Sequence, residues 1–192
     1  MSDHSKFISL ISKHLKNDNE ISVLDIGCGD ARMLFSLYNE LDFGFKRLLG
    51  VDSGIDDTRD PFYFENHLDL NKIYENQVSF EKELKDNVFE YIRENEMQFI
   101  EDCKSEFDLI IFSNFLHFFK WKTILKAIDA SIRLLKKEGI FYFLIANENH
   151  SYFQDEDKTI LDEDKFERLK KEYNIVFNEK GDGHYLLIIR GN

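Results

Sequence analysis

The sequence predicts an α/β fold in which a mostly parallel sheet carries helices on both faces and ends in an antiparallel hairpin. Along most of the chain, short and nearly continuous apolar segments alternate with longer segments of helical periodicity. This alternation is typical of strands that are buried on both faces of a parallel sheet. The C-terminal region differs, because two strand-like segments flank the turn KGDG, and a glycine-containing turn between two strands indicates a hairpin.

Composition and charge restrict the class of protein. A chain of 192 residues is long enough for one domain with a sizeable core, which we place over residues 1–192. The net charge of −12 argues against a nucleic-acid or anionic-membrane partner. Cys28 and Cys103 lie far apart without metal-ligand spacing, so we expect no metal site and a reducing, cytoplasmic compartment. Neither a signal peptide nor an apolar segment of membrane-spanning length is expected.

The N-terminal half predicts two helices and two strands. Apolar residues of Ser5–Lys16 fall on one helical face. The patterns predict a helix over residues 4–18, a buried strand over Ile21–Ile26, a helix over Asp30–Glu40, and a strand over Arg47–Val51 that ends at Asp52.

A long segment then separates the second strand from the next apolar segment. We predict a helical insert over residues 54–95, which holds Pro61 and the aromatic cluster Phe62–Phe64. One connecting helix would need far fewer residues. Two interpretations stay open: a pair of surface helices, or a lid or wall over a functional site.

The C-terminal half predicts three further parallel strands before the hairpin. The sequence KKEG ends one of its helices, with Gly139 as a candidate left-handed cap. The elements that we expect are a third strand over Met97–Ile100, a fourth over Phe107–Phe112, a helix over Lys120–Leu135, a fifth strand over Ile140–Ala146, a helix over Glu163–Tyr173, and hairpin strands over Ile175–Asn178 and Tyr185–Ile189.

A glycine-rich turn follows the first strand. Gly27 and Gly29 have no Cβ, so the main chain can turn sharply and approach a ligand closely. The helix that follows begins with unpaired N–H groups that suit an anionic group. The dinucleotide fingerprint has a third glycine where this chain has Arg32, and the Gly-Lys-Ser/Thr of a phosphate-binding loop is absent. A different ligand is therefore expected.

The segment LDIGCGDAR resembles motif I of the class I S-adenosylmethionine-dependent methyltransferases, at Asp25, Gly27 and Gly29, with Ala31 in place of the usual third glycine. Further along, LLGVDSG resembles the end of that family's second strand, FIEDC the end of its third, and FDLIIFSNFLHFF its motif IV. The ordered set is more specific than any single motif. The resemblance implies a seven-stranded Rossmann-like sheet of order 3-2-1-4-5-7-6.

The resemblance also implies a cofactor and its contacts. The cofactor would be S-adenosylmethionine, released as S-adenosylhomocysteine, with Asp52 accepting both ribose hydroxyls and Asp102 accepting the adenine amine while Cys103 lines the ring. A carboxylate suits two vicinal hydroxyl donors because it has two oxygens. The residues implied to bind the cofactor are Asp25, Gly27, Cys28, Gly29, Asp52, Ser53, Asp102, Cys103, Ser113 and Asn114.

Methyl transfer from a sulfonium is an in-line displacement that depends on positioning, and a base is needed only if the acceptor keeps a proton. His117 in SNFLHFF is the candidate catalytic base, and the alternative is a partly buried histidine that hydrogen-bonds the main chain. His150 is a second candidate. A set of aromatic residues could line an acceptor pocket or simply pack: Phe115, Phe118, Phe119, Trp121 and Tyr152.

A small-molecule acceptor is the expected substrate. Asn114 is not followed by the Pro-Pro-aromatic sequence of family members that methylate amide or base nitrogens. Glu179 and His184 give the tail a distant likeness to the tellurite- and thiopurine-resistance methyltransferases. Two other functions stay open, a nucleotide-dependent oxidoreductase and a non-catalytic S-adenosylmethionine-binding module, and so do the acceptor atom and the oligomeric state.

Overall fold

The computed structural model describes residues 3–15, 20–29, 31–42, 44–53, 88–150 and 159–191. Seven strands form a sheet in the order β3-β2-β1-β4-β5-β7-β6, so the predicted α/β fold and strand order are confirmed. The chain divides into two compact units, Met1–Phe99 and Ile100–Asn192. Among the described helices, none is long and apolar enough to cross a membrane.

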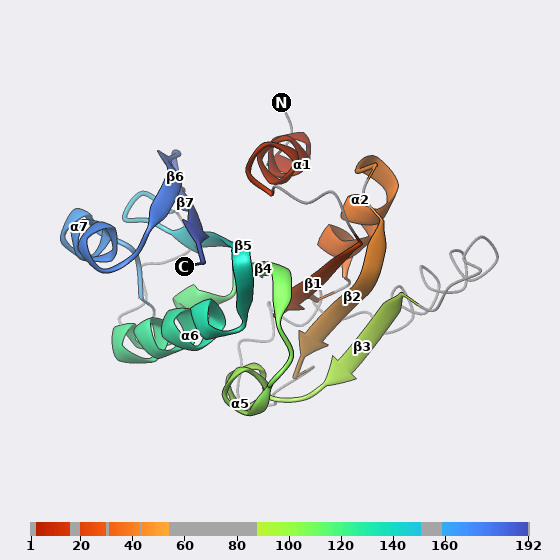
Figure 1. Ribbon diagram of the computed structural model, residues 1–192. Helices are drawn as coiled ribbons and strands as arrows, with labels where there is room; N and C mark the ends of the chain where they lie inside the picture. The colour runs from red at the N-terminus through yellow and green to blue at the C-terminus, as the bar shows by residue number, and fades with distance from the viewer. Residues whose placement is uncertain are drawn as a thin grey trace. The chain divides into compact units, whose positions relative to one another are not determined.

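The described part of the first unit contains three parallel strands. Its elements are α1 (Asp3–His14), β1 (Ile21–Ile26), α2 (Arg32–Glu40), β2 (Phe45–Asp52) and β3 (Phe89–Arg93). β2 pairs with β1 on one side and with β3 on the other, and α2 packs against β1 and β2 (Figure 1). All six residues of β1 are buried, as expected for a strand covered on both faces.

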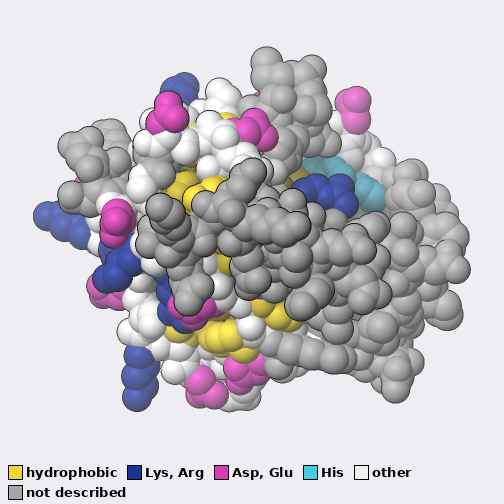
Figure 2. Space-filling view, turned by 90° about the vertical axis from the view of Figure 1, so that its right-hand side faces the viewer, with side chains coloured by type: hydrophobic (Ala, Val, Ile, Leu, Met, Phe, Trp, Pro, Cys, Tyr) yellow, Lys and Arg dark blue, Asp and Glu magenta, His cyan; other side chains and the backbone are white. Residues whose placement is uncertain are grey.

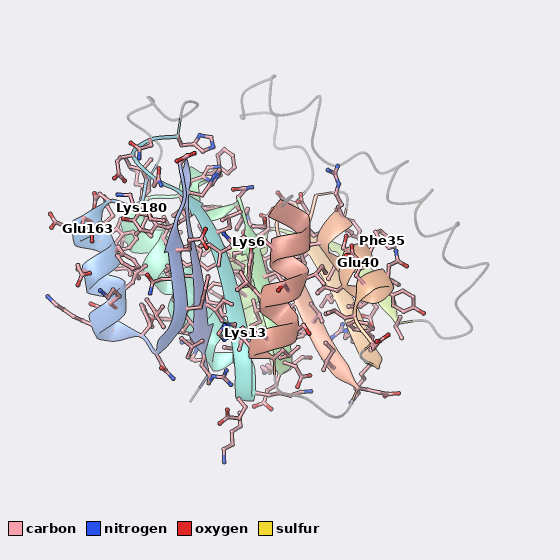
Figure 3. The ribbon with its side chains drawn as sticks, turned by 90° about the horizontal axis from the view of Figure 1, so that it is seen from above. Lys6, Lys13, Phe35, Glu40, Glu163 and Lys180 are labelled. Carbon is pink, nitrogen blue, oxygen red and sulfur yellow. The ribbon has the colours of Figure 1, made fainter. Side chains whose placement is uncertain are left out.

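Helix α2 presents one apolar face to this sheet. Leu34, Phe35 and Leu37 are buried, and the ring of Phe35, labelled in Figure 3, stacks on that of Phe89 in β3 with centroids 4.8 Å apart. The helix begins at Arg32, two residues after the predicted start, because Ala31 before it adopts a left-handed conformation with φ of 56°.

The second unit combines parallel and antiparallel pairs. Its elements are β4 (Phe107–Ser113), the 3-10 helix η1 (Leu116–Phe118), α6 (Trp121–Arg133), β5 (Leu135–Ala146), α7 (Glu163–Glu172), β6 (Ile175–Lys180) and β7 (His184–Arg190). β4 pairs with β5 in parallel, whereas β7 is antiparallel to both β5 and β6. The predicted C-terminal hairpin is confirmed.

Polar and aromatic contacts attach α7 to the hairpin. Glu163 at the start of α7 accepts a hydrogen bond from the Tyr185 hydroxyl at 3.0 Å, and the Tyr185 ring stacks on Phe166. Lys180, at the end of β6, lies over the Tyr185 ring with its Nζ 5.2 Å from the centroid. Figure 3 labels Glu163 and Lys180 on these two elements.

The prediction of a third strand over Met97–Ile100 is wrong. The third strand is β3 at Phe89–Arg93, and Met97–Ile100 lie inside helix α5 (Glu96–Asp102). Asn95 starts this helix, since its side-chain oxygen accepts from the Gln98 N–H at 3.1 Å and its carbonyl from the Phe99 N–H, as an N-cap residue does. A short apolar segment is ambiguous between helix and strand, and here capping decides.

Other boundaries also differ from the predictions. The proposed helical insert over residues 54–95 is wrong at its end, where β3 lies, and residues 54–87, with Pro61 and Phe62–Phe64, are outside the described residues. The segment KKEG belongs to β5 rather than to a helix end. Gly139 is needed there for packing, because a Cβ would come within 2.9 Å of the Lys136 carbonyl and 3.1 Å of the Phe107 carbonyl.

Candidate active site

The glycine turn after β1 is fastened to the end of β2 within the first unit. The N–H groups of Gly27 and Cys28 both donate to the Val51 carbonyl, at 2.8 and 3.3 Å, and the Gly29 N–H donates to the Asp52 carboxylate at 3.0 Å. Gly27 and Gly29 have φ of 68° and 53°, the left-handed region that favours glycine. A Cβ at Gly29 would meet nothing within 4 Å, so conformation, and not crowding, demands glycine at this position.

Cys28 fills the inside of this turn. It packs against Gly50 of β2 so closely that a Cβ there would lie 2.8 Å from its Sγ. Burial raises the pKa of the Cys28 thiol well above its ordinary value, and the negative charges of Asp25, Asp52 and Glu96 raise it further. A thiol under these conditions stays protonated and serves packing, because nucleophilic cysteines need a lowered pKa.

Three carboxylates therefore surround the turn in the first unit. Asp25 and Glu96 are each 1% exposed, and Asp52 is half-buried. Their negative charge favours a cationic group beside the turn, because charge interactions are stronger where solvent is excluded. The structure thus brings together the predicted residues Asp25, Gly27, Cys28, Gly29, Asp52 and Ser53.

Sequence reasoning missed Glu96. Its carboxylate accepts two hydrogen bonds from Ser53, one from the main-chain N–H and one from the hydroxyl, both at 2.9 Å. The signal was present, because Glu96 follows shortly after the true third strand. Misplacing that strand to Met97–Ile100 moved the expected strand end to Asp102.

Asp102 and Cys103 are not at a strand end. Asp102 is the last residue of α5 and is exposed, and Cys103 is a partly exposed free thiol whose Sγ is 3.9 Å from the Ser105 carbonyl. Neither residue therefore has the position at the end of the third strand on which the expected adenine contact was based. Their role in binding a cofactor stays a prediction.

In the second unit, β4 ends at Ser113 and is directly followed by Asn114, and both are predicted site residues. Asn114 adopts φ of 55°, which asparagine tolerates better than most residues. Its N–H donates to the Leu144 carbonyl of β5 at 3.1 Å, and its side chain is exposed. The segment beyond it is packed by rings, with Phe115 edge-on to both Phe112 and Phe119.

His117 lies in η1 and is only 3% exposed. Its ring contacts that of Phe118, with centroids 4.1 Å apart, and its main-chain carbonyl accepts from the Thr159 N–H at 3.0 Å. These contacts involve the ring and the main-chain carbonyl of His117. Its role as base and the alternative of a histidine that hydrogen-bonds the main chain both stay predictions.

The remaining candidates have structural contacts of their own. His150 is edge-on to His184 with ring centroids 4.5 Å apart, and burial lowers the pKa of His150. Trp121 begins α6 and is partly exposed, whereas Tyr152 is outside the described residues. In the parts of the chain that the structure describes, no group of three or more His, Cys, Asp or Glu side chains could hold a metal ion.

Residues 3–179 match the family model described as a methyltransferase domain. The chain belongs to this methyltransferase family. The predicted resemblance and the assignment as an enzyme are thereby confirmed. No curated protein matches the chain.

Solved methyltransferases share the fold at low sequence identity. Magnesium protoporphyrin IX methyltransferase ChlM from Synechocystis PCC 6803, with bound S-adenosylhomocysteine, has a TM-score of 0.68 at 12% identity, over 98% of this chain and 82% of that one. N-methyltransferase NodS from Bradyrhizobium japonicum WM9, also with S-adenosylhomocysteine, gives 0.64 at 16% over 97% and 86%. TehB from Haemophilus influenzae has a TM-score of 0.66 at 13% identity. The match covers 100% of this chain and 62% of TehB.

Proposed function

We propose that the protein transfers the methyl group of S-adenosylmethionine to a small-molecule acceptor and releases S-adenosylhomocysteine. The observation that carries the proposal is the glycine turn fastened to Asp52 by the Gly29 N–H, in a chain that matches the methyltransferase family over residues 3–179. Related folds bind the same cofactor, since ChlM and NodS were solved with S-adenosylhomocysteine.

The first unit supplies the groups that would hold the cofactor. The glycine turn would let the main chain approach the ligand, and Asp52 would accept hydrogen bonds from the ribose hydroxyls. When bound, S-adenosylmethionine supplies a methyl group on a positively charged sulfur. The carboxylates of Asp25, Asp52 and Glu96 favour this charged donor over the product, whose sulfur is neutral. These residues bind and orient, which is the main requirement of an in-line displacement.

In the second unit, Ser113 at the end of β4 and Asn114 directly after it stay proposed contacts of the cofactor. We assign His117 to the acceptor side. It follows in η1, beside the packed rings of Phe115 and Phe119. We propose that His117 removes a proton from acceptors that keep one at neutral pH. The roles of Asp102 and Cys103 beside the adenine remain part of the proposal, although these residues do not lie at the end of a strand.

A small acceptor agrees with the surface and with the related folds. The net charge is −12, and Figure 2 shows acidic and basic side chains interspersed over the described part of one face. ChlM acts on magnesium protoporphyrin IX, a small molecule, and we infer the same substrate class here. The free thiols of Cys28 and Cys103 support a cytoplasmic location.

Three measurements test this function. Mass spectrometry of ligand that co-purifies with the protein, followed by calorimetry, should show binding of S-adenosylhomocysteine and none of NADH. Methyl-labelled donor should then transfer its label to at least one member of a panel of small thiols, amines, hydroxyls and carboxylates. A folded protein that binds no S-adenosylhomocysteine would contradict the cofactor. Tight binding with no transfer to any acceptor would favour the non-catalytic binding module.

A further inference from the structure

Glu96 is a buried acidic residue with an unusual set of contacts. It is 1% exposed, although glutamate is almost never fully buried unless it is paired. Its Oε1 accepts from both the main-chain N–H and the hydroxyl of Ser53, each at 2.9 Å. Two hydrogen bonds thus converge on a single carboxylate oxygen from one residue that is 43 positions away in the sequence.

These contacts reach the glycine turn through the end of β2. Ser53 directly follows Asp52, and Asp52 accepts the Gly29 N–H at 3.0 Å. Glu96, Ser53, Asp52 and Gly29 therefore form a continuous series of covalent and hydrogen bonds inside the first unit. Fixing the peptide after Asp52 restricts the main-chain rotation that aims the Asp52 side chain.

The second carboxylate oxygen of Glu96, Oε2, allows a substitution that separates the hydrogen bonds of Glu96 from its charge. Oε2 is buried and has no hydrogen-bond partner among the residues that the structure describes, and an unsatisfied buried acceptor is costly. A glutamine at this position could accept from Ser53 through its amide oxygen, and its nitrogen would replace an oxygen that bonds to no described residue. Glu96→Gln therefore keeps both contacts with Ser53, whereas Glu96→Ala removes both.

We infer that Glu96 is a positioning residue of the cofactor site, which holds Ser53 and thereby sets the orientation of Asp52 toward the ligand. The inference rests on the proposed function. Its effect on the orientation of Asp52 passes through the two hydrogen bonds to Ser53 and not through the charge of the carboxylate. Glu96 itself need not touch the ligand.

Calorimetric titration with S-adenosylhomocysteine tests the inference on three variants of the full chain. Glu96→Ala should bind about 10-fold or more weakly than wild type, the scale of losing hydrogen bonds to a charged group. Glu96→Gln should bind within about 3-fold of wild type, because the contacts that matter are retained. Glu101→Ala changes an exposed glutamate of the same helix and should bind like wild type.

A double-mutant cycle separates positioning from direct contact and covers the case in which Glu96→Ala does not fold. Ser53→Ala removes the hydroxyl bond to Glu96, keeps the main-chain bond, and should weaken binding by a smaller factor. In a Glu96→Gln background, Ser53→Ala should cause the same loss as in wild type. In a foldable Glu96→Ala background it should cause no further loss, because the partner is gone.

The outcomes distinguish this inference from the proposed function. If wild type itself fails to bind S-adenosylhomocysteine, the proposed function is wrong. If wild type binds and Glu96→Ala binds equally well, the positioning role alone is wrong. A Glu96→Gln protein that folds but binds at least 10-fold more weakly than wild type would also contradict it, because the charge, and not the anchoring of Ser53, would then be decisive.

Discussion

The glycine turn of the first unit and the segment after β4 in the second unit both follow the end of a strand, but different interactions hold them in place. Each begins at the carboxyl end of a strand with a left-handed residue, Gly27 at φ of 68° and Asn114 at φ of 55°. The turn is then held by polar bonds to Val51 and Asp52 of the neighbouring strand. The segment after β4 is held by one main-chain bond to Leu144 and by ring packing around Phe115.

This difference explains which residues a sequence motif can identify. Polar bonds and positive φ angles restrict a position to a few residue types, so Gly27, Gly29 and Asp52 leave a recognisable pattern. Ring packing accepts many apolar combinations of similar volume. His117 therefore stands in a sequence context that fits either a base or a packed ring.

The largest expected effect concerns His117. If it is the base, His117→Gln should slow single-turnover methyl transfer on the order of 10²–10⁴-fold for an acceptor that keeps its proton. For an already ionised acceptor the same variant should be near wild type. The rates should be followed across pH. A rate within a few-fold of wild type on both kinds of acceptor would leave His117 with its packing role alone.

The next largest effect is expected at Gly50, where a substitution measures how tightly the glycine turn packs against β2. Gly50→Ala should destabilise the protein by about 1–3 kcal/mol, because the new Cβ would lie 2.8 Å from the Cys28 Sγ. Adding Cys28→Ala removes that sulfur and should recover part of the loss. Urea unfolding of wild type, both single variants and the double variant measures the coupling. Additive losses would show that the turn can shift away from β2.

A smaller effect is expected at His150 in the second unit. Burial lowers its pKa in the folded state, so the unfolded chain binds a proton more readily as the pH falls below about 6.5. His150 therefore opposes folding at acid pH and is without effect well above its unfolded pKa. His150→Gln should flatten the decline of stability between about pH 7 and 5. Parallel pH profiles for the two proteins would contradict the burial effect.

Most of the fold follows from the sequence. The apolar segments Ile21–Ile26 and Phe107–Phe112 mark strands because both faces are buried, and KGDG marks the hairpin because its turn chemistry is local. The third strand was misplaced because MQFI is short and apolar, and the Asn95 cap that makes it helical depends on one side chain.

Only part of the site can be predicted from the sequence, because some of its contacts join residues that are far apart in the chain. The glycine turn and Asp52 are adjacent to strands whose ends are clear. Glu96 acts on Ser53 across 43 positions, and no local pattern reports such a pairing. The clash that would exclude a Cβ at Gly50 depends on the Cys28 rotamer, which is likewise a property of the folded chain.

The central claim is that the cofactor is bound at the glycine turn with its ribose on Asp52, and calorimetry with S-adenosylhomocysteine tests it most directly. Asp52→Ala should weaken binding by about 1–3 kcal/mol, the scale for losing a charged hydrogen-bond partner. The matched control is Asp42→Ala, which changes an exposed carboxylate after α2 in the same unit and should bind like wild type. A folded Asp52→Ala protein with the affinity of wild type would contradict the claim.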